Sequence, residues 1–159
     1  MDQTEFVEAV RPLVDHRWLE PTVALLDETM RDSASHDFGH LLRVINNADR
    51  IARGESERGA EVDREALMAA ALLHDLVDLP KDDPERHLAS RRSAEEAVAH
   101  YEDVANFDDE RLSTIEHAIS AHSFSAGIPA ETLEAKILTD ADRLDALGAL
   151  GVARCFYVL

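Results

Sequence analysis

The stretch that most constrains this chain is residues 69–78, AAALLHDLVD, where an unbroken apolar run leads directly into His74 and Asp75. Such a run of alanine and leucine indicates the buried end of a helix. An imidazole followed at once by a carboxylate is an unfavourable way to end that helix, because an unpaired charge in the core is destabilising. A bound divalent cation would remove the penalty, so the stretch predicts further metal ligands elsewhere in the chain.

Two other stretches supply such ligands. Upstream, His36 and His40 stand four residues apart at the start of an apolar helical pattern, where a lone histidine would be an ordinary core or capping residue. Downstream, residues 139–145, TDADRLD, carry three aspartates. The candidate metal ligands are therefore His40, His74, Asp75 and Asp142, with Asp140 as the rival of Asp142.

Apolar residues recur at spacings of three and four along most of the chain, and no stretch of any length alternates with a period of two. The pattern predicts an all-α fold, a helical bundle with the metal site between its core helices. We expect a single domain over residues 1–159, with a helical scaffold at 1–31 and the metal-site core at 36–154. The expected helices cover residues 4–14, 21–31 with Pro21 in a first-turn position, 37–53, 64–74, 87–104, 109–122 and 130–148, and polar connections cover 54–62 and 76–86.

The charge of the chain is strongly acidic, with 33 Asp and Glu against 16 Lys and Arg and a formal net charge of −17. Only Lys81 and Lys136 are lysines. This composition suits a halophilic source, where salt screens the self-repulsion, and an ordinary acidic bacterial protein is the alternative. Because an acidic surface repels polyanions, we expect no nucleic-acid groove and a small phosphorylated substrate instead.

No apolar run reaches the roughly 18–20 residues that a membrane span needs, and no secretory signal opens the sequence. The single cysteine, Cys155, excludes a disulfide within the chain. These features predict a cytoplasmic protein without membrane contact, and they leave its oligomeric state open.

Two imidazoles and two carboxylates form a ligand set for a divalent cation. Four protein ligands around a six-coordinate ion leave two positions for water and substrate, which suits Mn²⁺, Fe²⁺, Co²⁺, Ni²⁺ or Mg²⁺ better than a closed structural zinc site. Such an ion makes bound water more acidic and polarises a phosphoryl oxygen. Facing helices of a bundle commonly supply ligands of this kind.

His40, the pair His74-Asp75 and then Asp142 resemble the H…HD…D pattern of the HD superfamily of metal-dependent phosphohydrolases. The resemblance runs from His36 to about residue 154, and AALLHD is a phrase typical of that superfamily. HDFGHLLRV, HSFS and DADRLDALGALGVAR further resemble a subgroup of small HD proteins, some of which are nucleoside triphosphate pyrophosphohydrolases. The resemblance implies one divalent metal ion held by the four residues, and it favours Asp142 over Asp140.

The resemblance also implies roles around the metal. Asp78 occupies the position, four after His74, where several HD hydrolases carry a glutamate that orients or deprotonates water; it is the candidate general base, and a loop-capping role is the alternative. His36 is the second catalytic candidate, as a proton donor to the leaving phosphate, unless it caps a helix. Asp145 is expected to support or pack against the site. The candidate substrate contacts are Arg43, Lys81, His122 and Arg143.

Two other classes of function stay open on the sequence. A nucleotide- or metal-binding module without turnover would keep the ligands and lack the base, and an aspartate at residue 78 in place of a glutamate leaves room for it. A di-iron oxygenase would need further histidine ligands, for which His117 and His122 are the candidates. The same two histidines are the candidates for a second ion in a phosphohydrolase.

Overall fold

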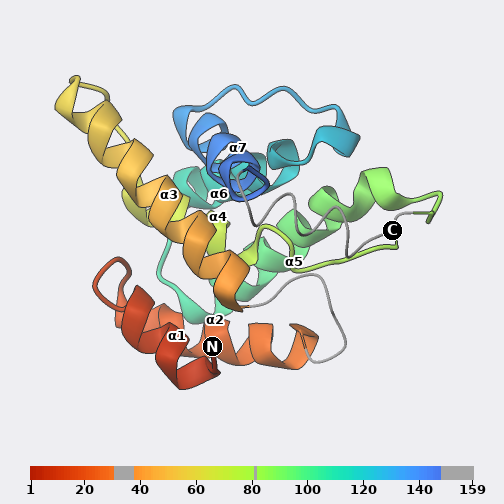
Figure 1. The fold of residues 1–159 in the computed structure, drawn as a ribbon, viewed down its shortest axis with the longest axis horizontal. Helices are drawn as coiled ribbons and strands as arrows, with labels where there is room; N and C mark the ends of the chain where they lie inside the picture. The colour runs from red at the N-terminus through yellow and green to blue at the C-terminus, as the bar shows by residue number, and fades with distance from the viewer. Residues whose placement is uncertain (31–37, 81, 148–159) are drawn as a thin grey trace.

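The computed structural model describes residues 1–30, 38–80 and 82–147 (Figure 1). Within these residues the chain forms seven α-helices and two short 3₁₀ helices, with no strand, which confirms the all-α prediction. The elements in chain order are α1 (Gln3–Val10), α2 (His16–Met30), α3 (Phe38–Glu57), α4 (Arg64–Leu73), η1 (Arg86–Leu88), α5 (Ala89–Val104), α6 (Asp109–His122), η2 (Phe124–Ala126) and α7 (Leu133–Asp145).

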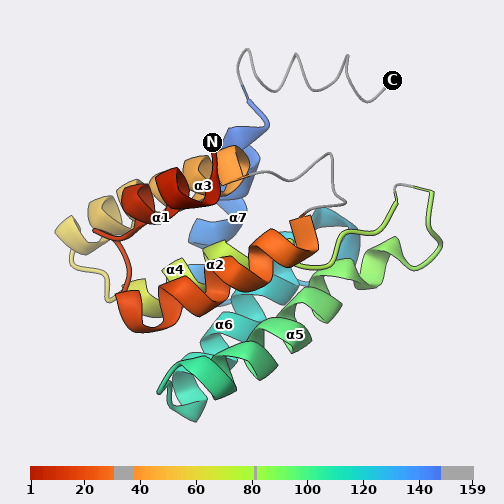
Figure 2. The same ribbon diagram turned by 90° about the horizontal axis from the view of Figure 1, so that it is seen from below.

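Helix α4 lies at the centre of the bundle, and α3, α5, α6 and α7 all contact it (Figures 1 and 2). Every residue from Ala66 to Leu73 is buried, because this helix is apolar on all sides. Asp63 fixes its start by accepting hydrogen bonds from the backbone N–H groups of Glu65 and Ala66. The polar pair His74 and Asp75 therefore follows directly from the end of a buried central helix.

The N-terminal helices α1 and α2 pack across α3 and α5 respectively (Figure 2). Helix α2 begins at His16, five residues before Pro21, so the prediction of a first-turn proline is wrong. Asp15 starts the helix instead, since its carboxylate accepts from the Arg17 backbone N–H at 2.9 Å. The early start places Trp18 and Leu19 in the core.

Other boundaries differ from the predictions by four residues or fewer. Helix α3 continues to Glu57, through residues predicted as a connection. Helix α7 covers Leu133–Asp145 rather than 130–148, because the Thr132 hydroxyl caps it by accepting from the Ala135 N–H; residues 148–159 lie outside the described part. No helix among the described residues is long and apolar enough to cross a membrane.

Candidate metal centre

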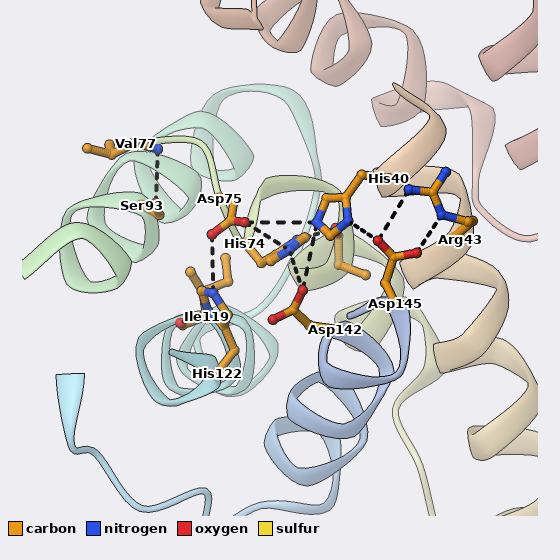
Figure 3. A network of polar contacts seen from close by, with 11 residues as sticks. His40, Arg43, His74, Asp75, Val77, Ser93, Ile119, His122, Asp142 and Asp145 are labelled. Atoms are coloured by element: carbon orange, nitrogen blue, oxygen red, sulfur yellow. Dashed lines mark hydrogen bonds and ion pairs between the residues drawn. The ribbon is translucent and has the colours of Figure 1, made fainter. Parts of the chain in front are cut away.

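Three segments far apart in the sequence meet beyond the end of α4 (Figure 3). His40 comes from the first turn of α3, His74 and Asp75 directly follow α4, and Asp142 lies near the end of α7. The Nε2 atom of His40 lies 3.9 Å from Asp75 Oδ2 and 3.7 Å from Asp142 Oδ1. The Nε2 atom of His74 lies 3.4 and 3.9 Å from the same two oxygens. The fold thus brings the four predicted ligands together.

The imidazole rings are held in one orientation by their Nδ1 atoms. Nδ1 of His74 lies 2.9 Å from the carbonyl oxygen of Ala71, and Nδ1 of His40 lies 2.8 Å from Asp145 Oδ2. Because a carbonyl or an ionised carboxylate only accepts, each Nδ1 carries the proton and donates. In the neutral rings Nε2 then carries the lone pair, the form in which an imidazole binds a metal.

The clearest sign of a cation site is the Nε2 atom of His74. This atom is buried and has no hydrogen-bond partner among the described residues. Burial lowers the pKa of His74, outweighing the opposing effects of Asp75 and Asp142, so the ring stays neutral. A buried lone pair that faces two carboxylates is unfavourable unless a cation lies between them. The donor set therefore fits a divalent metal ion.

His122, the last residue of α6, approaches Asp75 from the other side (Figure 3). Its Nδ1 donates to the carbonyl of Ile119 at 2.6 Å, and its Nε2 lies 3.2 Å from Asp75 Oδ1. Burial disfavours the charged ring, yet the hydrogen bond and the charge of Asp75 raise the pKa of His122 above its ordinary value. Two groups of three residues thus have their ligand atoms within 4.8 Å of one another: His40, His74 and Asp142, and His74, Asp75 and His122.

The site is closed on its histidine side and half-open on its carboxylate side. The side chains of His74 and His40 are 0% and 4% exposed, while those of Asp75 and Asp142 are 26% and 30% exposed. An ion held here would have protein on one side and solvent on the other. This is the arrangement of a site with positions left for water and substrate.

Asp145 supports His40 from behind. Its side chain is 3% exposed, and its Oδ2 accepts a hydrogen bond from Nδ1 of His40. Arg43 donates to the same carboxylate from Nε to Oδ1 at 2.5 Å and from Nη2 to Oδ2 at 3.2 Å. Burial alone would raise the pKa of Asp145, but the hydrogen bonds from Arg43 and His40 lower it below its ordinary value. The guanidinium of Arg43, predicted as a phosphate contact, is thus engaged with Asp145.

The remaining predicted residues lie around this centre or outside the described part. Asp78 is exposed in the loop after α4, and that loop is tied to α5 by a hydrogen bond from the Val77 N–H to Ser93 Oγ. Arg143 and the rival ligand Asp140 are exposed on α7. His117 belongs to neither group of possible ligands, and its Nε2 accepts from the Glu131 N–H. His36 and Lys81 lie outside the described residues.

The contact between His40 and Asp145 was predicted only in part from the sequence. Asp145 was expected near the site, but its bond to His40 crosses 105 residues and depends on the packing of α3 against α7. The available signal was the equal spacing of two pairs, His40 with Arg43 and Asp142 with Asp145, each three residues apart on one helical face. Likewise, nothing local indicated that His122 would face Asp75.

Fold and site together define an all-α protein with a half-open His/Asp centre suited to a divalent cation. The chain matches the family model described as HD domain over residues 37–147, which is more than half of its length. The chain belongs to the HD domain family, whose members are typically metal-dependent phosphohydrolases that bind divalent metals.

A curated relative is similar over much of this region. It is "Uncharacterized protein YpgQ" from Bacillus subtilis (strain 168), 36% identical over 131 residues. The match covers 79% of this chain and 58% of the relative, so the chain spans less than two thirds of the length of the curated relative.

Proposed function

We propose that this protein is a metal-dependent hydrolase of a nucleotide or another small phosphate ester, with (deoxy)nucleoside triphosphates, split to monophosphate and pyrophosphate, as the first substrates to test. One observation supports this most: the buried lone pair of His74 faces two partly exposed carboxylates. Such a centre has both the ligands for a cation and access for a substrate. The choice of a phosphate ester as substrate is supported by the match to the HD family. It is also supported by the sequence resemblance to the subgroup of small HD proteins.

In this proposal His40, His74, Asp75 and Asp142 hold one divalent ion, with manganese the first to test. The ion would supply an acidified water and a polarised phosphoryl oxygen. Asp78 lies on the loop that leaves the centre, where its carboxylate accepts the proton of the attacking water. His36 gives a proton to the leaving phosphate.

Charge balance decides which substrate groups the site accepts. With neutral imidazoles, Asp75 and Asp142 give −2, which a divalent ion cancels to zero. An approaching phosphate therefore meets no net repulsion at the centre, although the chain carries −17 in all. Further attraction comes from His122, Arg143 and Lys81 as substrate contacts. An extended polyanion would meet the acidic surface as well, so a small substrate is favoured.

The test is a product assay with Mn²⁺ and a panel of nucleoside triphosphates and monophosphates, resolving pyrophosphate from orthophosphate in low salt and in about 2 M KCl. We expect pyrophosphate from triphosphates. His74→Ala and Asp142→Ala should abolish metal retention and turnover together, whereas Asp140→Ala, on the exposed face of the same helix, should leave both unchanged. Full activity of either ligand variant would refute the site.

Orthophosphate from monophosphates would instead identify a nucleotidase. Bound metal without any product would favour the binding module that has no turnover.

A second candidate is a centre with two ions, and one observation favours it. His122 and Asp75 belong, with His74, to a second group of possible ligands; because Nε2 of His74 can bind only one ion, the second ion would rest on Asp75 and His122. A di-iron oxygenase would also need two ions. Counting the metal ions per chain in the purified protein separates the one-ion centre of the first proposal from a two-ion centre.

A further inference from the structure

Asp145 differs from the other groups that orient the histidines. His74 and His122 donate from Nδ1 to neutral backbone carbonyls, those of Ala71 and Ile119. Of these three histidines, His40 alone donates from Nδ1 to a carboxylate, and that carboxylate is almost fully buried. A charged acceptor holds an imidazole more firmly than a carbonyl does and makes its other nitrogen a better metal ligand.

The spacing of residues along α3 and α7 joins this contact to the proposed metal ligands. His40 and Arg43 lie three residues apart on α3, and Asp142 and Asp145 lie three apart on α7, so each pair shares a helical face. The two faces meet in Figure 3, where Asp145 accepts from both α3 residues while Asp142 faces Nε2 of His40. Each helix thus carries one proposed metal ligand and, one turn further on, one residue of the support behind it.

Arg43 completes the support. Its side chain is 40% exposed, yet its guanidinium makes two hydrogen bonds to Asp145. Paired donors of this kind fix the plane of a carboxylate as well as neutralise its charge. Without Arg43, the buried carboxylate would lose the hydrogen bonds that it accepts from Nε and Nη2 of that side chain.

We propose that Asp145 is a positioning residue that fixes His40 as an Nε2 metal ligand, and that Arg43 acts on the metal centre through Asp145. The inference rests on the proposed metal site and adds two residues to it. Arg43 then has a role in ion binding that is separate from any contact with phosphate.

The first experiment measures Mn²⁺ affinity by calorimetry on metal-free protein comprising residues 1–159. Asp145→Asn keeps the size of the side chain and removes its charge, and it should weaken Mn²⁺ binding by about 10- to 100-fold, the usual effect of removing such a supporting group. Asp140→Asn is the matched control, because it makes the same change on the exposed face of the same helix. Equal affinities of the two variants would overturn the proposal.

A second measurement does not depend on the variant folding. Imidazole ¹⁵N spectra of the metal-free wild-type protein should show His40 protonated at Nδ1 and unprotonated at Nε2. The opposite tautomer, or a mixture of both, would refute the positioning role. Conversely, if the wild-type protein binds no Mn²⁺, or if His74→Ala binds it equally well, the metal site itself fails, and this outcome is distinct from a failure at Asp145 alone.

Arg43 is tested by a double-mutant cycle. If Arg43 acts through Asp145, Arg43→Gln should change Mn²⁺ affinity in the wild-type background and have no further effect in Asp145→Asn. Additive effects, or no effect of Arg43→Gln in either background, would exclude this role. A raised KM with unchanged Mn²⁺ affinity would instead assign Arg43 to the substrate.

Discussion

Asp142→Asn should have opposite effects on the metal-free and the metal-bound protein. Asp142 Oδ1 lies 3.7 Å from Nε2 of His40 and 3.9 Å from that of His74. The three atoms are acceptors, and Nε2 of His74 is buried without a hydrogen-bond partner among the described residues, which costs about 1–3 kcal/mol. The substitution introduces an N–H donor within about 1 Å of hydrogen-bonding distance and removes repulsion with Asp75. We expect the metal-free protein to gain about 1 kcal/mol, or about 2–4 °C in Tm.

Bound metal should reverse the order of stability of the wild-type protein and the Asp142→Asn variant. An ion present at about 100 times its Kd should stabilise the wild-type protein by about 2.7 kcal/mol, and the variant, which lacks one ligand, should lose most of this gain. Thermal unfolding followed by circular dichroism in EDTA and in MnCl₂ measures both effects. Asp140→Asn changes the net charge equally and should show no reversal, since Asp140 is exposed. A variant that is less stable than wild type in EDTA and equally stabilised by Mn²⁺ would refute the reasoning.

Three further predictions concern stability. The lowered pKa of Asp145 means that its stabilisation is complete above the ordinary value of 3.8 and is lost as the pH falls through the folded-state value; Arg43→Gln should make this acid-induced loss smaller in a urea titration of the metal-free protein. Tyr101→Phe removes the buried hydrogen bond from its hydroxyl to the Ala69 carbonyl and should cost about 1–3 kcal/mol in urea unfolding; an unchanged midpoint would contradict this. If the acidic surface reflects adaptation to salt, the protein should unfold at a higher temperature in about 2 M than in about 0.1 M KCl, and equal midpoints would exclude it.

The sequence predicted the elements whose signals are local. Helix α6 covers Asp109–His122, the predicted range, and α4 ends at Leu73, one residue before the predicted end. The start of α2 was wrong because Pro21 is a strong first-turn signal, and the cap at Asp15 outweighed it. The end of α3 was placed too early because residues 54–57 are polar, and an exposed last turn needs no apolar residue.

The metal ligands of the site could be predicted from the sequence more readily than the residues that contact those ligands. His74 and Asp75 stand out because polarity interrupts an apolar run, and that signal lies within ten residues. By contrast, the contacts from His122 to Asp75 and from Asp145 to His40 cross 47 and 105 residues. The first depends on how α6 packs against α4 and the second on how α7 packs against α3, which no local pattern specifies. His100 shows the same limit, because its hydrogen bond with Thr22 crosses 78 residues.

The pairing of charges in this centre explains why a divalent ion suits it. Three carboxylates contact the histidines: Asp75, Asp142 and Asp145. The charge of Asp145 is balanced locally by Arg43, so it can orient His40 without adding to the charge that an ion must cancel. Asp75 and Asp142 then present −2 at the half-open side. A monovalent ion would leave one negative charge of this pair uncompensated, whereas a divalent ion would balance both. If Asp145→Asn also changes the preference for Mn²⁺ over Ca²⁺, Asp145 affects the geometry of the centre as well as its charge.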